Sequence, residues 1–325
     1  MKPSRLVRHW LLLLIAAGIA LAAQPAFAQG KITRLVVGFP PGGGIDFVAR
    51  VLSVQLGKEL GQQVIVENRV GANAVIAAEF VAKAAPDGQT LYLTSTGAVA
   101  ISPALYEKLP YDPVRDFAPV TLVVNTAELL VSSASNSADT ATQFIENARK
   151  RKDGVTIASS GIGSVPHLAM ELLADVTKAK LVHVPYKGTG PALTDVIGGH
   201  VDALFIDVPV ALPHVKAGTL KPLGIAAPKR HPVLPDTKTL QEMGITGVDS
   251  DNWYAIFAPK ATPPAEIERI GQAARRALED ESVKSKLLAS GVEPAPGSPS
   301  QLSALLKNDS EKWRRIIRAK NIKGE

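Results

Sequence analysis

A glycine-rich turn between an apolar strand and a helix is the part of this sequence best suited to hold a ligand. The turn lies within residues 34–46 and contains the consecutive glycines Gly42, Gly43 and Gly44. Because glycine has no side chain, the backbone of such a turn approaches a ligand closely. The helix that follows offers free N–H groups and the positive end of its dipole, which favour an anion. The pattern predicts an anion-binding loop in which Phe39 packs on the apolar part of the ligand.

Two further turns place hydroxyl groups and glycines at strand ends. Residues 95–97 (Ser-Thr-Gly) end a predicted strand, and residues 159–164 (Ser-Ser-Gly-Ile-Gly-Ser) follow another. Hydroxyl groups at these positions are suited to donate hydrogen bonds to a carboxylate. Helix capping is the alternative role, because Ser and Thr are preferred N-cap residues. One side chain can fill both roles.

Two of the three charged side chains near the predicted strand ends have alternative roles. Lys187 either pairs with a second carboxylate of the ligand or is solvated, as most lysines are. Asp207 either accepts a hydrogen bond from an amino or hydroxyl group of the ligand or caps the next helix. Asp46 lies in the first turn of a helix and would repel a bound anion, so we interpret it as structural. The predicted ligand-binding residues are Phe39, Pro41, Gly42, Gly43, Gly44, Ser95, Thr96, Gly97, Ser159, Ser160, Gly161, Ser164, Tyr186, Lys187 and Asp207.

Patterns typical of enzymes and metal sites are absent from the sequence. No Gly-x-Ser-x-Gly motif occurs, and the six histidines show no His-x-x-x-His spacing. Without cysteine there is no thiolate to complete a zinc site. Residues 161–163 (Gly-Ile-Gly) lack the third glycine of a dinucleotide-binding fingerprint. We therefore expect no cofactor, no metal and no catalysis, with His167 and His183 as framework residues.

The N-terminal residues have the pattern of a cleaved export signal. Lys2, Arg5 and Arg8 precede a short apolar run, and residues 26–28 (Ala-Phe-Ala) end the segment with small residues. The apolar run is shorter than the roughly 20 residues needed to cross a bilayer. We expect a signal peptide over residues 1–28 and a periplasmic protein. The net charge of +6 falls to about +3 without the signal, which does not favour nucleic-acid binding. We expect a monomer.

Short β-branched strands alternate with longer helical patterns, which is typical of an α/β protein. The residues predicted as strands are 31–39, 63–68, 90–95, 129–132, 155–158, 181–184, 203–206 and 253–257, and the stretches 215–218 and 223–227 continue the alternation. The residues predicted as helices are 45–60, 75–84, 141–150, 167–176, 264–279, 282–290 and 299–319, with a further helix ending at residue 198. The candidate turns follow the carboxyl ends of strands, where open α/β sheets bind their ligands.

Several ordered motifs resemble the Bug family, the TctC-like solute-binding receptors of tripartite tricarboxylate transporters. The resemblance runs from about residue 32 to the C-terminus. It rests on residues 39–44 (FPPGGG), 66–69 (VENR), 84–88 (AAPDG), 109–114 (LPYDPV), 115–119 (RDFAP), 182–188 (VHVPYKG) and 191–195 (PALTD). The family implies a two-lobed periplasmic binding protein of type II that closes like a clam over a small organic carboxylate and delivers it to a membrane transporter.

The resemblance also implies a division of the chain between the lobes. Residues 29–125 and 251–325 would form lobe 1, and residues 126–250 would form lobe 2. Ile45 stands where the family often has a hydroxyl, which favours a less polar, branched or aromatic ligand. A ligand sensor that partners a sensor kinase, or a periplasmic enzyme, are the alternative functions on the same scaffold.

Overall fold

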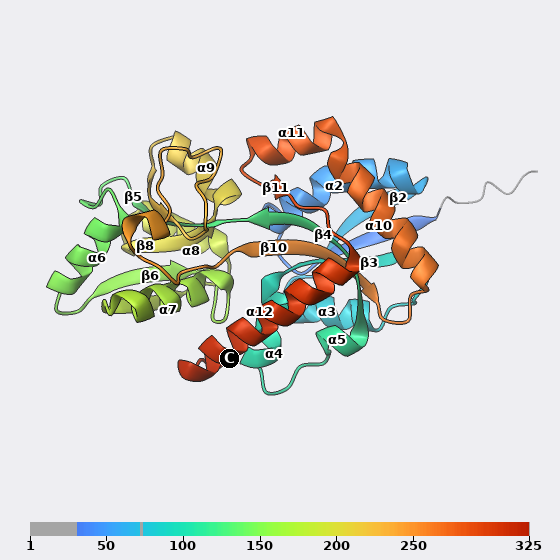
Figure 1. Cartoon of the computed structure of the whole chain (residues 1–325), viewed down its shortest axis with the longest axis horizontal. Helices are drawn as coiled ribbons and strands as arrows, with labels where there is room; N and C mark the ends of the chain where they lie inside the picture. The colour runs from blue at the N-terminus through green and yellow to red at the C-terminus, as the bar shows by residue number, and fades with distance from the viewer. Residues whose placement is uncertain (1–30, 72–73, 325) are drawn as a thin grey trace, which may run out of the picture. The chain divides into compact units, whose positions relative to one another are not determined.

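One compact unit spans Ile32–Glu325 and contains two β-sheets with helices around them (Figure 1). This computed structural model describes residues 31–71 and 74–324. The predicted signal peptide therefore lies outside the described residues. No helix within those two ranges is long and apolar enough to span a bilayer.

The first sheet has the strand order β11-β4-β10-β3-β1-β2. Strands β1, β2 and β3 pair in parallel, whereas β10 lies antiparallel between β3 and β4. The strands are β1 (Ile32–Val37), β2 (Gln63–Asn68), β3 (Thr90–Ser95), β4 (Phe117–Thr126), β10 (Asn252–Pro259) and β11 (Glu293–Pro294). The parallel strands all end at the same edge, which brings the turns after β1 and β3 together.

The second sheet repeats this arrangement, with the order β7-β6-β8-β5-β9. Strands β6, β7 and β8 are parallel, and β5 lies antiparallel between β8 and β9. The strands are β5 (Glu128–Ser133), β6 (Val155–Ser159), β7 (Leu181–Pro185), β8 (Ala203–Asp207) and β9 (Leu220–Ile225). In each sheet one strand, β10 in the first and β5 in the second, thus lies antiparallel between two strands that run in the opposite direction.

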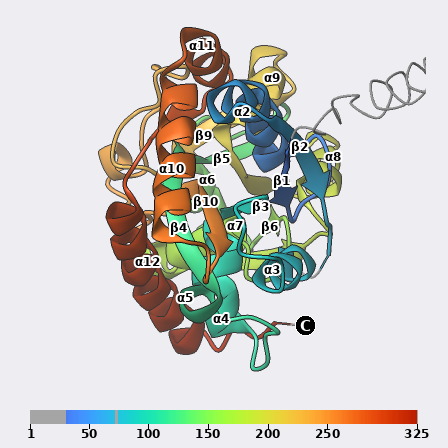
Figure 2. The same cartoon turned by 90° about the vertical axis from the view of Figure 1, so that its right-hand side faces the viewer.

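Helices cover both faces of the first sheet because its strands are apolar on both faces. Every residue of β10 is buried, with Tyr254 and Ile256 in the core under one face and Trp253 and Phe257 in the core under the other. Helices α2 (Gly44–Leu60), α10 (Pro264–Glu279) and α11 (Glu281–Ala289) contribute to the first core. Helices α3 (Val75–Ala82), α4 (Ser102–Leu105), α12 (Pro299–Ala319) and the π-helix η2 (Gly97–Ile101) contribute to the second. Helices α10 and α12, both seen with β4 in Figure 2, thus pack on β4 from opposite faces of the sheet.

The second sheet is covered in the same way. Helices α6 (Ala141–Lys150) and α7 (Val165–Thr177) enclose one core, and α8 (Thr189–Ile197) and α9 (Val208–Lys216) enclose the other. Two of these helices begin at capping side chains. The Thr140 hydroxyl accepts from the Gln143 amide at 3.3 Å, and the Ser164 hydroxyl accepts from the His167 amide at 3.4 Å. Short helices α5 (Pro113–Asp116) and η3 (Gln241–Met243) lie in connecting segments.

The chain passes from the first sheet to the second through a very short connection. Only Ala127 separates Thr126, the last residue of β4, from Glu128, the first residue of β5. The return to the first sheet ends at β10, whose first residue is Asn252. The segments at both passages carry polar side chains that belong to the candidate site.

Most predicted elements are confirmed, several with identical bounds: residues 63–68, 90–95, 141–150, 264–279 and 299–319. The prediction that a strand-like stretch continues over residues 215–218 is wrong. Val215 and Lys216 end helix α9, which tolerates Pro213 in its interior, and the following strand begins at Leu220. Strand β4 was not predicted, because its polar residues and Pro119 interrupt the apolar alternation.

Candidate functional site

A cavity of about 750 Å³ lies at the carboxyl ends of the parallel strands of both sheets. The turns after β1 and β3 contribute from the first sheet, and those after β6, β7 and β8 from the second. The predicted binding residues that line it are Phe39, Pro41, Gly42, Gly43, Gly44, Ser95, Gly97, Ser160, Ser164, Lys187 and Asp207. The structure therefore brings together turns that are far apart in the sequence.

The glycine turn is held open toward this cavity by its own backbone. Gly42 has a φ of +86°, a left-handed conformation that glycine adopts without strain. Gly43 is the N-cap residue of α2, and no side chain of the described residues caps this helix. The first N–H groups of α2 therefore lie at the cavity wall, in the part formed by Gly43 and Gly44, without a capping side chain.

Asp46 fixes the shape of this turn, in agreement with the structural role predicted for it. Its carboxylate accepts hydrogen bonds from the Gly42 amide at 2.9 Å, the Arg50 guanidinium at 2.8 Å and the Asn68 amide at 2.8 Å. Burial acts to raise the pKa of Asp46, but the hydrogen bonds from Arg50, Gly42 and Asn68 outweigh it, so the pKa is lowered. Asp46 stays charged and directed away from the cavity.

The hydroxyl groups after β3 divide into two roles. Ser95 lines the cavity, whereas Thr96 is fully buried and its hydroxyl oxygen accepts from the Trp253 amide at 3.2 Å. Thr96 therefore joins β3 to β10 and does not line the cavity, contrary to its predicted place. Spacing alone could not separate the two, because they are sequence neighbours that point to opposite sides of a strand end.

The turn after β6 shows the same division. Ser160 and Ser164 line the cavity, and Ser164 also caps α7. Ser159 and Gly161 do not line it: the Ser159 hydroxyl lies 2.6 Å from His183 Nε2 and 3.0 Å from the Gly161 carbonyl. This pair of residues fixes the turn that presents the two cavity-lining serines.

His167 and His183 are framework residues, as expected. Their rings stack with centroids 3.7 Å apart, and His167 Nδ1 accepts from the Gly163 amide at 3.0 Å. Burial, with a smaller contribution from His167, lowers the pKa of His183 to about 4. The His183 side chain is therefore uncharged around neutral pH. Neither of the two rings lines the cavity.

The predicted pair Tyr186 and Lys187 also separates. The Tyr186 hydroxyl donates to the Asp195 carboxylate and is not part of the cavity lining. Lys187 is exposed and lines the cavity, and within the described part of the chain its ammonium group makes no ion pair. It is a cation placed at the cavity wall and left for solvent or a ligand.

Asp207 forms the centre of a polar cluster that the sequence did not reveal. Its Oδ2 accepts from the Tyr254 hydroxyl at 2.9 Å, and its Oδ1 accepts from the Asn252 amide at 3.2 Å and the Thr126 hydroxyl at 3.4 Å. The capping role considered for Asp207 is wrong, because its side chain makes no capping bond to α9. Glu128 lies directly opposite Asp207 in the antiparallel register of β5 and β8.

Burial and proximity shift the pKa values of this cluster in one direction. Burial, and secondarily the charge of Asp207, raises the pKa of Glu128 well above its ordinary range. Burial also raises the pKa of Asp207, although hydrogen bonds from Tyr254 and Asn252 oppose it. Both carboxyl groups are acceptors when ionised, so their close approach favours a shared proton.

The comparison with a family model decides the family. The model described as the tripartite tricarboxylate transporter family receptor, TctC, matches residues 48–322. The chain belongs to this TctC receptor family. Protein BugT of Bordetella pertussis is 33% identical over 324 residues, covering 99% of each chain.

Two solved structures share the fold. The chain resembles R. palustris Rpa4515 with adipate at 31% identity and a TM-score of 0.85, covering 90% of this chain and 97% of that one. It resembles MatC from Rhodopseudomonas palustris with bound malate at 33% identity and a TM-score of 0.80, covering 90% and 100%. These matches confirm the predicted family and the two-lobed α/β fold of periplasmic binding proteins, and they place the chain among solute-binding proteins.

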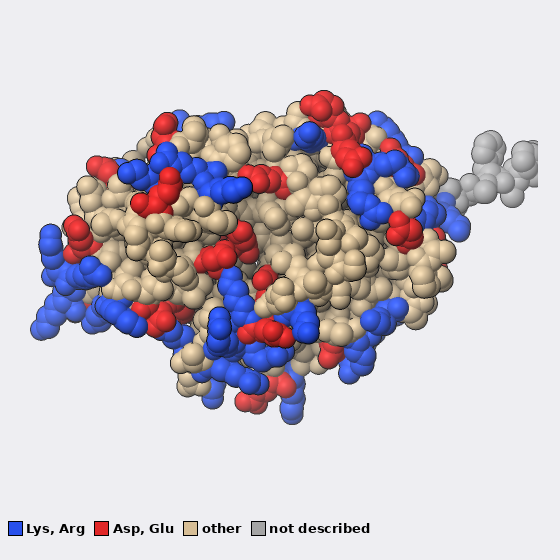
Figure 3. Space-filling view, viewed as in Figure 1, with Lys and Arg blue, Asp and Glu red and all other residues tan. Residues whose placement is uncertain are grey.

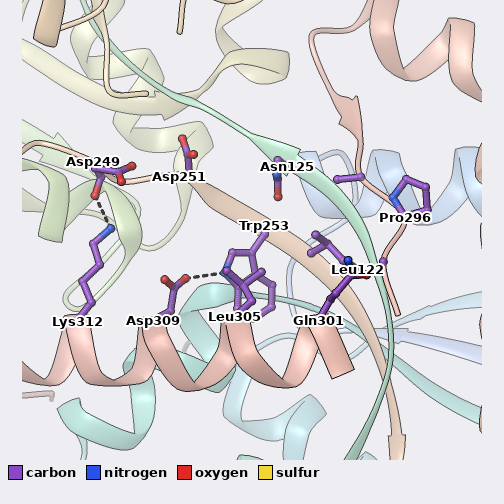
Figure 4. Close-up of a pocket in the computed structure, with 12 residues that line it drawn as sticks. Leu122, Asn125, Asp249, Asp251, Trp253, Pro296, Gln301, Leu305, Asp309 and Lys312 are labelled. Atoms are coloured by element: carbon purple, nitrogen blue, oxygen red, sulfur yellow. Dashed lines mark hydrogen bonds between the residues drawn. The ribbon is translucent and has the colours of Figure 1, made fainter. Parts of the chain in front are cut away.

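A second cavity of this TctC-family chain, of about 410 Å³, lies between β10, β4 and α12. Figure 3 shows acidic side chains at the middle of this face, and Figure 4 shows Asp249, Asp251 and Asp309 around the cavity. Lys312 donates to the Asp249 carbonyl at 2.6 Å, and the Trp253 indole donates to Asp309 at 2.7 Å (Figure 4). Helix α12 thereby holds the segment through which the chain returns to β10.

Replacing Asp251 with Asn is expected to stabilise the protein at high pH only. Burial, followed by the charge of Asp249, raises the pKa of Asp251 to about 6. Because the folded pKa lies above the unfolded one, the stability that protonated Asp251 provides is present below about pH 4 and is lost as the pH rises through about 6. At pH 8 the substitution should recover about 1–2 kcal/mol of unfolding free energy.

Thermal unfolding of the Asp251→Asn variant at pH 8 and pH 4 measures this effect. Asp153→Asn, at an exposed position, is the matched control and should leave the melting temperature unchanged at both pH values. A gain for Asp251→Asn that is equal at both pH values would contradict the proposed cause.

Proposed function

We propose that the chain is a periplasmic receptor that captures a small organic carboxylate in the 750 Å³ cavity and delivers it to a tripartite tricarboxylate-type membrane transporter. The family supports a transport receptor. Two similar proteins were solved with adipate and with malate, both of which are carboxylates.

The observation that carries this proposal is the uncapped N-terminus of α2 at the cavity wall. Gly42, Gly43 and Gly44 line the cavity, and no described side chain accepts from the first N–H groups of α2. A bound carboxylate would accept from these groups and lie at the positive end of the helix dipole. Ser95 on the first sheet and Ser160 on the second would donate further hydrogen bonds, whereas the Ser164 hydroxyl already donates to the Gly161 carbonyl at 2.7 Å.

The proposal includes the predicted division of the chain. Residues 29–125 and 251–325 form lobe 1, residues 126–250 form lobe 2, and residues 1–28 are removed on export to the periplasm. Residue 127, which alone separates a strand of one sheet from a strand of the other, supports a boundary at this point. Closure of the lobes around the ligand excludes water and strengthens the hydrogen bonds to the carboxylate.

A thermal-shift panel tests this function. A bound acid at about 100 times its Kd stabilises the folded state by about 2.7 kcal/mol, which corresponds to a rise of roughly 4–5 °C in the melting temperature of a chain of this length. We expect at least one member of a panel of mono-, di- and tricarboxylates, aromatic acids and amino acids to produce such a rise. The protein should be purified from the periplasm of the expressing cells and dialysed before the assay.

Neutral amides of the same acids are the matched ligand controls. They keep the shape of the ligand but lack the anion, so they should give no shift at the same concentrations. The receptor function is contradicted if no acid stabilises the protein, or if an acid is consumed during the assay.

A further inference from the structure

Three buried oxygen atoms at one part of the cavity wall have almost no hydrogen-bond partners in the chain. They are Oε1 and Oε2 of Glu128 and Oδ1 of Asn252, and apart from a proton that Glu128 shares with Asp207, none of them has a partner among the described residues. Glu128 is 0% exposed and Asn252 is 7% exposed, yet both line the cavity. A buried acceptor without a donor is costly, so such groups are normally paired in a folded protein.

The surrounding residues fix these oxygens in place. Glu128 and Asp207 lie opposite each other in the β5–β8 register, and the Asn252 amide donates to Asp207 Oδ1 at 3.2 Å. Tyr254 donates to the other Asp207 oxygen at 2.9 Å. The donors in the cluster are thus directed at Asp207, and the acceptors of Glu128 and Asn252 remain for a group outside the chain.

The missing partner must supply several donors and a positive charge. An ammonium group has three N–H donors, no acceptor and one positive charge. It would satisfy the three oxygens and offset the charge of the Glu128–Asp207 pair with charge-assisted hydrogen bonds. A water molecule supplies only two donors and no charge.

We propose that Glu128, Asn252 and Asp207 form an ammonium-binding subsite, and that the receptor takes a zwitterionic amino carboxylate with an apolar side chain. This inference rests on the proposed carboxylate-receptor function and narrows its ligand class. The proposed ligand class differs from adipate and malate, the dicarboxylates named with the two similar structures.

The two ends of such a ligand fit the distances in the cavity. A Cβ atom placed on Gly44 would lie 3.6 Å from Asp207 Oδ2 and 3.0 Å from the Tyr254 hydroxyl. The glycine turn that receives the carboxylate is therefore adjacent to the ammonium subsite, as the short separation within an amino acid requires. The apolar lining residues suited to the ligand side chain include Phe39, Ile45, Phe47, Leu193 and Val210.

The competing ligand is an acid whose second carboxylate accepts from a protonated Glu128. Burial raises the pKa of Glu128, so a second carboxylate at the subsite would favour its protonated form, whereas an ammonium group would favour its ionised form. Asp207, Asp251 and Tyr254 face Glu128, and Lys187 and His214 line the same cavity. The direction of proton exchange on binding therefore distinguishes the two ligand classes.

Calorimetry with matched ligand pairs tests the subsite. Leucine and 4-methylpentanoate, phenylalanine and 3-phenylpropanoate, and aspartate and succinate differ by one ammonium group, and the panel is extended to the other apolar amino acids. We expect the wild-type protein to bind the preferred amino acid at least about 10-fold more tightly than its deamino partner. In buffers of different ionisation enthalpy, binding of the amino acid should release protons near pH 7.

Glu128→Gln should reduce this preference by about 10-fold or more, because the variant keeps the size of the side chain and loses its charge. Glu146→Gln, at an exposed position on α6, is the control and should leave the preference unchanged. Equal or tighter binding of the deamino acids, no proton release, or an unchanged preference in Glu128→Gln would overturn the subsite while leaving a carboxylate receptor. The proton-release measurement needs only the wild-type protein, so it decides even if the variant does not fold. Failure of every acid to bind would overturn both proposals.

Discussion

Gly43→Asp is expected to weaken carboxylate binding by about 100-fold or more while the protein remains folded. Gly43 is the N-cap residue of α2, with φ −77° and ψ 168°, a conformation that an Asp N-cap adopts readily. The new side chain would accept from the first N–H groups of α2, which are the proposed donors to the ligand. It would occupy the anion site and repel a second anion.

This variant should keep or slightly raise the melting temperature of the ligand-free protein, because Asp is preferred over the native glycine at an N-cap by about a few tenths of a kcal/mol. Loss of binding could then not be attributed to unfolding. Titration calorimetry with the best acid of the panel measures the affinity, and thermal unfolding measures the stability.

Gly43→Ala is the matched control for this prediction. A Cβ atom at this position would lie 3.6 Å from the Pro40 carbonyl, an ordinary contact, and the backbone is already in a region open to alanine. We expect its affinity to remain within about threefold of the wild type, since alanine neither caps the helix nor carries charge. If Gly43→Asp bound the acid as tightly as the wild type, the glycine turn would not be the site of the carboxylate.

The largest expected effect on stability is that of Trp253→Ala. Trp253 is 2% exposed in the core between β10, α3 and α12, and its indole donates to Asp309 at 2.7 Å. Removing a buried tryptophan costs about 3–5 kcal/mol, and the substitution also leaves the half-buried Asp309 without this donor. We expect the melting temperature to fall by roughly 10 °C, measured by calorimetry or circular dichroism.

Trp253→Phe separates the two contributions. It keeps much of the aromatic packing and loses the N–H donor, so we expect it to lose about half as much stability as Trp253→Ala. Burial acts to raise the pKa of Asp309 and the Trp253 hydrogen bond to lower it, so both variants should be more destabilised when Asp309 is ionised. A Trp253→Ala variant as stable as the wild type would show that the core repacks around the gap.

The elements of this chain were predictable where the pattern is local. Helices α10 and α12 have one apolar face and α6 has a Thr N-cap, and their predicted bounds agree with the structure. Strand β4 and helix α9 were missed. Pro119 and Pro213 contradict local propensity there, and packing against neighbouring elements outweighs that propensity.

The candidate site divides in the same way. The glycine turn could be predicted because its glycines, strand and helix are adjacent in sequence. The sequence predicted that Ser95 and Thr96, and likewise Ser159 and Ser160, bind the ligand together. In the structure only Ser95 and Ser160 line the cavity. Which neighbour faces the cavity depends on the orientation of each strand end, which composition does not encode.

By itself, the sequence determined the family, the α/β class and the glycine turn, because each depends on short-range order along the chain. Only the tertiary structure brought Glu128 to Asp207 and Asn252, residues separated by 79 and 124 positions from Glu128. Their meeting depends on the antiparallel register of β5 with β8 and on the return of the chain through β10. Burial then changes the chemistry of the cluster, since carboxyl groups removed from water hold protons and seek donors that they do not need in solvent.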